Sequence, residues 1–237
     1  MLPIYFPNLI IMDNISFIIQ PATEQHSKFA ETITDEMEQS AKARGTGIAK
    51  RSPEYIKMKM MEGKAVIALT KEGEWAGFCY IEAWGHGKFV ANSGLIVAPK
   101  FRKFGLARLI KKEIFKLSRA KYPDSKIFGL TTGAAVMKIN SELGYIPVSY
   151  GDLTDDEQFW KGCQSCINYE ILKSKEKQNC LCTAMLYEPK AIKDTHEDLA
   201  LRTDFKKNIK LFERWTRLKK FVMLNLKKTK NKTFGLF

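Results

Sequence analysis

The stretch with the clearest capacity for chemistry is residues 94–107, Gly-Leu-Ile-Val-Ala-Pro-Lys-Phe-Arg-Lys-Phe-Gly-Leu-Ala. It reads as a strand, a tight turn and a helix start, with Arg102, Gly105 and Ala107 at i, i+3 and i+5. A strand that enters a helix in this way leaves unpaired N–H groups at the positive end of the helix dipole. Small residues let a pyrophosphate approach the backbone, and the neighbouring Lys103 adds positive charge. The turn therefore predicts an anion site, the alternative being an ordinary surface turn.

A second group of chemically competent residues is Cys163-x-x-Cys166 followed by Cys180-x-Cys182. Four soft ligands at short spacing suit a structural, tetrahedral Zn²⁺. Such an ion would explain how the polar segment 151–182 holds its shape. The alternatives are reduced thiols packed as small hydrophobes, or a redox-responsive pair.

Composition restricts the possible classes of protein. The chain has 237 residues, of which 45% are hydrophobic and 11% aromatic, so it can build a sizeable core. No apolar run approaches the roughly 20 residues that a membrane span needs. Pro3, Pro7 and Asp13 interrupt the apolar start, which also lacks a basic leader, so no signal peptide is expected. Five cysteines without an export signal indicate reduced thiols and a cytoplasmic location.

The positive charge is concentrated near the C-terminus. The formal net charge is +13, and residues 206–232 contribute +10 of it, from 11 basic residues and one acidic residue. Apolar residues recur there every three or four positions, which predicts an amphipathic helix. It is either docked on the domain with solvated lysines or in contact with a membrane surface or nucleic acid. Its aromatic residues follow the apolar stripe, which disfavours base stacking, so no DNA partner is expected.

The order of predicted elements indicates a mixed sheet with helices packed on it, an α/β or α+β architecture. The predicted strands span residues 16–20, 65–70, 75–84, 89–97, 127–132, 146–150 and 181–187. The predicted helices span residues 23–44, 53–62, 106–121 and 134–143. We divide the chain into an N-terminal extension (1–14), a domain (15–188) with a cysteine-containing insertion (151–182), and a basic C-terminal helical extension (189–237).

The turn resembles the acyl-CoA-binding motif of the GNAT superfamily, [Arg/Gln]-x-x-Gly-x-[Gly/Ala], in its usual strand–turn–helix context. Residues 143–148, Leu-Gly-Tyr-Ile-Pro-Val, are similar to the Gly-Phe sequence that ends the family's next helix. The resemblance covers residues 15–188. It implies the GNAT fold, a mostly antiparallel sheet with splayed central strands and helices on both faces. It also implies an N-acyltransferase that uses a CoA thioester, acetyl-CoA or succinyl-CoA.

The resemblance assigns the CoA-binding residues. The backbone of Leu95 and Val97 would hold the pantetheine, and a strand N–H would polarise the thioester carbonyl. The pyrophosphate would lie on the turn, which consists of Arg102, Lys103, Phe104, Gly105, Leu106 and Ala107. The amine then attacks directly, without an acyl-enzyme.

Two proton transfers remain to be assigned. Many family members place a Tyr four residues before the helix-ending Gly to protonate the sulfur. Here Asn140 stands at that position and can donate a hydrogen bond but not usefully a proton. For the base, Glu82 is the best candidate, because it shares a strand face with Phe78, Tyr80 and Trp84. The alternative for Glu82 is a solvated side chain, and His86 is expected to be a loop residue.

The acceptor is assigned by a fainter resemblance. Residues 160–187 look like a subgroup associated with arginine biosynthesis in Bacteroidetes-type bacteria, in which glutamate is the expected amine. Arg44 and Arg51 flank the loop where this fold usually recognises the acceptor, and an Arg binds carboxylates in a bidentate manner. Two alternatives stay open: a protein N-terminal or lysine acetyltransferase, and a non-catalytic CoA-binding sensor. A homodimer is also open.

Overall fold

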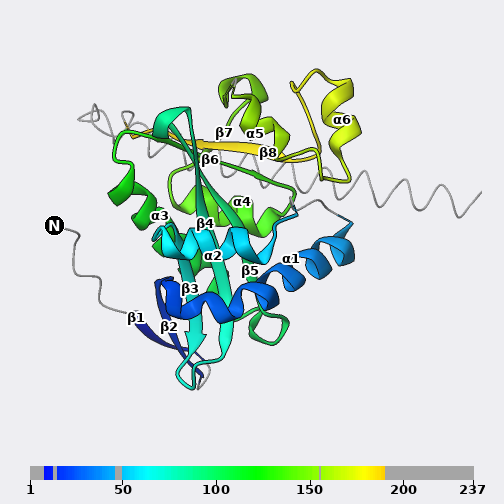
Figure 1. Cartoon of the computed structure of the whole chain (residues 1–237). Coiled ribbons are helices and arrows are strands. Elements are labelled where there is room, and N and C mark those ends of the chain that lie inside the picture. Colours follow the sequence, from blue (N-terminus) through cyan, green and yellow to red (C-terminus); the bar gives the residue numbers. More distant parts are fainter. Residues whose placement is uncertain (1–7, 13–14, 46–49, 155, 190–237) are drawn as a thin grey trace, which may run out of the picture. The chain divides into compact units, whose positions relative to one another are not determined.

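The computed structural model describes residues 8–12, 15–45, 50–154 and 156–189 (Figure 1). The predicted basic extension, residues 189–237, lies outside the described residues apart from Pro189. None of the described helices is long and apolar enough to span a membrane.

The described strands form one eight-stranded sheet in the order β1-β2-β3-β4-β5-β6-β8-β7. The strands are β1 (Asn8–Met12), β2 (Ile15–Pro21), β3 (Ala65–Thr70), β4 (Trp75–Trp84), β5 (Phe89–Val97), β6 (Lys126–Thr131), β7 (Ile146–Pro147) and β8 (Thr183–Tyr187). All neighbours pair antiparallel except β5 and β6, which are parallel. The predicted mixed, mostly antiparallel sheet is therefore confirmed. Strand β1 lies within residues 1–14, for which we predicted only an extension, and it adds an edge strand beside β2.

The described α-helices are α1 (Ala30–Arg44), α2 (Pro53–Met61), α3 (Leu106–Lys121), α4 (Ala134–Glu142), α5 (Glu157–Lys161) and α6 (Tyr169–Ser174). Four of them match the predicted order, and α5 and α6 in the insertion were not predicted. The helix predicted from Thr23 is divided, because a 3-10 segment (Glu24–Phe29) precedes α1. The side chain of Ser52 caps α2 by accepting from the Tyr55 N–H, and Gly45 ends α1 with a left-handed φ of 59°.

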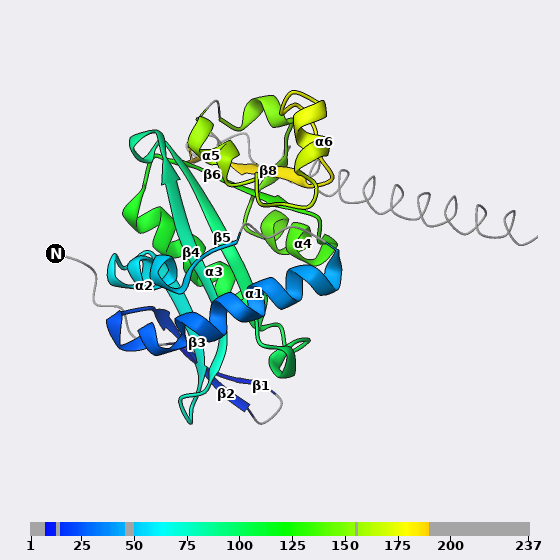
Figure 2. The same ribbon diagram turned by 45° about the vertical axis from the view of Figure 1, so that its right-hand side comes forward.

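Helices cover both faces of the sheet, as predicted (Figure 2). A Cβ on Gly77 of β4 would collide with the Ile110 side chain of α3, whereas a Cβ on Gly94 of β5 would collide with Met37 of α1. Side chains alternate along β4, so Cys79 lies on the α3 face. Tyr80, Glu82 and their neighbours lie on the opposite face, with α1 and α2.

The central strands are splayed. Strand β5 pairs with β6 only over Phe89–Ala91, against Lys126–Phe128. Beyond Ala91 the two strands separate, so the second half of β5 has no partner in β6. The fork is the structural counterpart of the predicted gap for pantetheine.

The cysteine-containing insertion folds around an apolar cluster of its own. The members of this cluster from the insertion and its flank are Tyr150, Leu153, Phe159, Trp160 and Leu172. They pack against Phe128 of β6, and the Trp160 indole donates to the Thr154 carbonyl at 2.8 Å. Apolar packing therefore shapes this segment.

Candidate active site

The most irregular point of the sheet is a bulge in β5. Two residues, Gly94 and Leu95, oppose the single residue Cys79 of β4, since Phe78 pairs with Ile96 and Tyr80 pairs with Ser93. Gly94 has a φ of +63° and lies against Tyr80, where a side chain would not fit. The bulge therefore requires glycine at position 94.

The free edge of β5 lies directly beyond this bulge. The Ala98 N–H donates to the Ala76 carbonyl of β4, so the polar groups of Leu95 and Val97 point to the other edge, toward β6, where the Val97 carbonyl accepts from the Arg102 guanidinium. Because β6 has diverged there, it does not pair with them. The predicted pantetheine-binding backbone at Leu95 and Val97 thus faces the fork.

The turn into α3 has the conformation of an anion cradle. Lys103 and Gly105 both have positive φ, of 73° and 75°, and no side chain caps the helix that starts at Leu106. No acidic residue occupies the first turn of α3. Phe104 is half-buried, and Ala107 packs partly against the core. The N–H groups at this helix start are accordingly left for an external acceptor.

The three basic residues of the turn have different roles. The Arg102 guanidinium donates to the Val97 carbonyl at 3.1 Å and to Glu36 and Ser40 of α1 at 2.6 and 2.7 Å. Lys100 forms an ion pair with Glu74. Lys103 is exposed and forms no ion pair with a described residue. Arg102 therefore holds the turn against α1, and Lys103 supplies the unneutralised charge.

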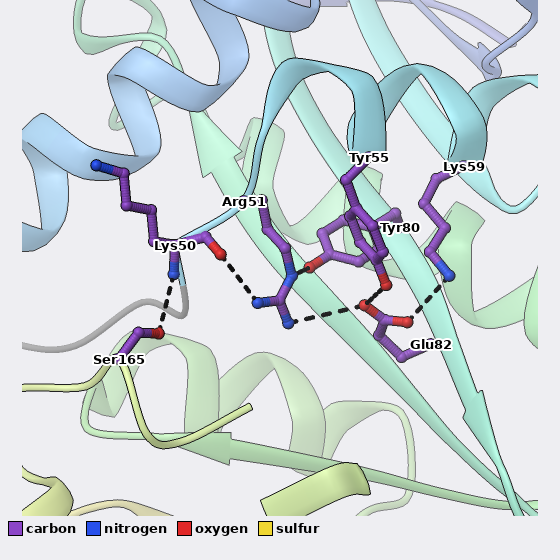
Figure 3. Close-up of polar contacts among 7 residues, drawn as sticks. All are labelled: Lys50, Arg51, Tyr55, Lys59, Tyr80, Glu82 and Ser165. Atoms are coloured by element: carbon purple, nitrogen blue, oxygen red, sulfur yellow. Dashed lines mark hydrogen bonds and ion pairs between the residues drawn. The ribbon is translucent and has the colours of Figure 1, made fainter. Parts of the chain in front are cut away.

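Glu82 lies in a polar cluster with Tyr55 and Lys59 of α2, on the face of the sheet that α1 and α2 cover (Figure 3). Glu82 as a whole residue is only 7% exposed, which excludes the solvated alternative. Tyr55 donates its hydroxyl hydrogen to Glu82 Oε1, and Lys59 Nζ lies 3.0 Å from Oε2. A guanidinium nitrogen of Arg51 lies 3.8 Å from Oε1. The cluster joins one carboxylate to two cations and carries a net positive charge.

The two tyrosines of this cluster remain protonated near neutral pH. Burial raises the pKa of Tyr55, and the adjacent Glu82 carboxylate raises it further. Burial likewise raises the pKa of Tyr80, whose oxygen accepts from Arg51 Nε at 2.9 Å. Both phenols thus act as fixed hydrogen-bond donors or acceptors.

Arg51 connects this cluster to a groove of about 710 Å³ between α1 and the insertion. The lining of the groove includes Glu38, Lys50 and Arg51, with Ser165 from the insertion. Ser165 accepts from the Lys50 N–H at 3.2 Å. Met37 also lines the groove, and its side chain packs against β5 at Gly94. Of the two predicted acceptor-binding arginines, Arg51 lies at this groove, and the Arg44 side chain lies outside the described residues.

Asn140 lies on α4 at the β6 side of the fork. Its amide nitrogen is 3.5 Å from the position a Cβ would take on Gly129, the first β6 residue past the β5 pairing. The side chain is 1% exposed, and its carbonyl oxygen has no hydrogen-bond partner. The amide nitrogen makes one weak contact, 3.7 Å from Met185 Sδ. A buried acceptor without a donor is costly, so this oxygen is free to bind a ligand N–H.

The predicted zinc site is not supported. Within the described part of the chain, no three metal-binding side chains are placed to hold an ion, and Cys163, Cys166, Cys180 and Cys182 are free thiols. Burial raises the pKa of Cys163 to about 11 and that of Cys182 to about 12, so both are neutral thiols near pH 7. The apolar cluster around Trp160 supplies the order for which we had invoked a metal.

Sequence reasoning missed Tyr55 and Lys59. They are four residues apart on α2, so they share a helix face, and Lys59 stands among buried Ile56 and Met60. A lysine at an otherwise buried position is a sequence signal for a buried partner. The identity of that partner, Glu82, depends on how α2 packs on β4.

Comparisons with known proteins were made for the whole chain. No family model and no curated protein matches it. N-acetylglutamate synthase from Neisseria gonorrhoeae, complexed with coenzyme A and N-acetyl-glutamate, matches 73% of this chain with a TM-score of 0.52 and 17% identity. Rv2747 from Mycobacterium tuberculosis, in complex with CoA, matches 72% with a TM-score of 0.51 and 14% identity. A GNAT-family acetyltransferase from Listeria monocytogenes matches 76% with a TM-score of 0.51 and 11% identity. The matches cover 35% of the Neisseria chain and 98% and 99% of the other two chains.

Proposed function

The chain has the fold of the GNAT acetyltransferases, and from this premise we propose that it is an acyl-CoA-dependent N-acyltransferase. It would transfer the acyl group of acetyl-CoA or succinyl-CoA directly to the amine of a small acceptor, an amino acid such as glutamate. One observation carries the proposal: β5 pairs with β6 only over Phe89–Ala91, which leaves a fork beside the bulge at Gly94.

The fork and the α3 turn suit the CoA thioester. The turn offers N–H groups and the unpaired charge of Lys103 to the pyrophosphate, and the free edge of β5 offers hydrogen bonds to the pantetheine amides. The Asn140 carbonyl adds a buried acceptor for an amide N–H at the other side of the fork. Two of the similar structures contain CoA, which supports the same assignment here.

The groove and the Glu82 cluster suit an acceptor that carries carboxylates. Arg51 uses part of its donor set on Tyr80 and on the Lys50 carbonyl, and its position at the groove leaves N–H groups for a ligand. The surplus positive charge of the cluster attracts anions. The Neisseria synthase was solved with N-acetyl-glutamate, which favours glutamate as the acceptor.

The proposed reaction begins with loss of a proton from the acceptor ammonium. Glu82 lies two residues, about 7 Å, along β4 from Tyr80, which packs on the bulge, so it would accept that proton through water. The amine then attacks the thioester carbonyl, and a β5 N–H at the bulge stabilises the oxyanion. Collapse of the intermediate forms the amide and releases CoA.

A biosynthetic role in the cytoplasm is part of the proposal. All five cysteines of the described residues are free, which fits a reducing compartment. With glutamate as the acceptor, the proposed activity would belong to amino-acid biosynthesis.

The test is CoA-thiol release from acetyl-CoA or succinyl-CoA with each common amino acid. We expect release with glutamate, and a rise of about 10- to 100-fold in the glutamate KM for Arg51→Met, because a charge-assisted hydrogen bond is lost. The acyl-CoA KM should stay within about twofold. Lys112→Met, at an exposed position of α3, is the control.

The possible outcomes separate the competing functions. Release only with peptides bearing a free N-terminus or lysine would indicate a protein acetyltransferase. CoA binding without turnover on any amine would indicate a sensor.

A further inference from the structure

Lys111 of α3 is a buried cation without a counter-charge. It is 2% exposed, and it forms no ion pair with a described residue. Its ammonium lies 5.2 Å from the centroid of the Tyr145 ring, a cation–π contact. A buried ammonium without an anion is costly, and one aromatic face offsets only part of that cost.

The side chain lies on the stripe of α3 that faces the fork. Lys111 and Ser118 are seven residues apart and therefore share a face of the helix. Ser118 accepts from the Asn92 amide of β5 at 2.7 Å, and Asn92 is the first β5 residue past the pairing with β6. Between them, Phe115 packs on Tyr145 and on Tyr187 of β8. The stripe thus contacts β5 where it leaves β6 and contacts β8 through Phe115.

Tyr145 fixes the position of Lys111 relative to β5. The Tyr145 hydroxyl donates to the Asn92 side-chain oxygen at 3.2 Å, and the Tyr145 ring makes the cation–π contact with the Lys111 ammonium. Lys111 also interacts electrostatically with Cys79, the residue opposite the bulge, whose thiol donates to the Ser93 carbonyl. Lys111 is therefore level with the bulge, on the α3 face.

The titratable groups that face Lys111 are Cys79 from β4 and Tyr145 from the segment after α4. Burial raises the pKa of Cys79 to about 11 and raises the pKa of Tyr145 well above its ordinary value, so both are neutral near pH 7. Burial lowers the pKa of Lys111 to about 8. An acid in this range is charged at neutral pH and still gives up its proton readily.

We infer that Lys111 is the proton donor to the departing CoA thiolate, reaching the sulfur from the α3 face of the fork. This inference rests on the proposed function. It assigns the task for which Asn140 has no usable proton to a buried ammonium beside Cys79, the residue opposite the bulge. The missing counter-charge is then the thiolate itself.

In the proposed step the amine nitrogen forms the C–N bond as the C–S bond breaks, and the C–S electron pair moves to sulfur. One N–H of the Lys111 ammonium transfers its proton to sulfur, which yields the CoA thiol and a neutral lysine amine. The proton that the acceptor ammonium lost to solvent through Glu82 restores the charge of Lys111.

The test measures the ionisation of the thiol of bound CoA, and it needs no acceptor. The full-length protein is titrated with CoA and with desulfo-CoA, and the difference in ultraviolet thiolate absorbance is followed against pH. In the wild type we expect the bound thiol to titrate at least about one unit below free CoA, because an adjacent ammonium stabilises the thiolate. In Lys111→Met, where methionine is an apolar replacement of similar length, the thiol of bound CoA should have a pKa at or above that of free CoA. Lys112→Met should match the wild type.

The outcomes distinguish the two levels of the inference. Equal thiol titration in the wild type and Lys111→Met, with CoA bound to both, would overturn the role of Lys111 and leave the proposed function standing. No binding of CoA by the wild type would overturn both.

Discussion

The buried ion pair between Glu82 and Lys59 allows a quantitative test of the site. Both side chains are 9% exposed, and the two closest charged atoms are 3.0 Å apart. Glu82→Gln keeps the shape of the side chain and removes its charge. Lys59 then remains buried with its charge, and Arg51 loses its anion at 3.8 Å.

The magnitude follows from these distances. At an effective dielectric constant of about 20, the attraction between Glu82 and Lys59 is on the order of 5 kcal/mol, which the desolvation of both ions largely offsets. Removing one charge loses the attraction but leaves the other ion desolvated, so Glu82→Gln should lower the free energy of unfolding by about 3–5 kcal/mol. Lys59→Met should cost less, about 1–3 kcal/mol, because Glu82 keeps Arg51 and the Tyr55 hydroxyl.

The assay is denaturant unfolding of the wild type, both single variants and the double variant. The double variant should lose less unfolding free energy than the two single variants lose together. We expect the difference, which is the coupling energy, to be about 2 kcal/mol. The exposed pair Glu38–Lys42, 2.8 Å apart, provides the control cycle, for which we expect a much smaller coupling because solvent screens both charges. A coupling at Glu82–Lys59 no larger than that of the surface pair would refute the buried cluster.

Three further predictions concern the bulge, the buried lysine and the thiols. Gly94→Ala should lower the free energy of unfolding by about 2–4 kcal/mol, because Gly94 has a positive φ and a Cβ there would collide with Tyr80. Gly73 also has a positive φ but faces open space, so Gly73→Ala should lower it by only about 1 kcal/mol in the same denaturation assay. Burial lowers the pKa of Lys111 from 10.5 to about 8, so the unfolded state binds more protons between these pH values. The free energy of unfolding of the wild type relative to Lys111→Met should therefore rise by about 3 kcal/mol from pH 8 to pH 10.5, and a flat difference would contradict the burial of a charge. Burial raises the pKa of Cys163 from 9.0 to about 11, so its alkylation at neutral pH should be about 100-fold slower than that of free cysteine. Mass spectrometry of the labelled peptide measures this rate.

The sequence predicts best what is encoded locally. Helix α3 has the predicted bounds, and its preceding turn has the predicted strand–turn–helix context, because periodicity, Pro99 and Gly105 all act within a few residues. The fork followed only from the family resemblance, since a loss of pairing between two strands leaves no local signature. The zinc prediction failed because the apolar residues of the insertion are contributed singly by separate elements, so no periodic pattern reveals their cluster.

The chemistry of individual side chains depended on packing that the sequence does not record. Alternation along β4 placed Glu82 beside Tyr80, but its burial and its two cations come from α2 and from Arg51, which are more than 20 residues away. The sequence placed Arg102 in the pyrophosphate-binding turn, and the structure adds that its guanidinium braces this turn against α1.

That brace links the two halves of the proposed site. Helix α1 holds Arg102 through Glu36 and Ser40, and the same helix lines the groove with Glu38 and touches the bulge with Met37. A movement of the turn on binding a pyrophosphate would therefore be transmitted to the groove by one rigid helix. Since α1 is 15 residues long and Glu36 and Glu38 lie within one turn of each other, the transmission needs no intervening flexible segment.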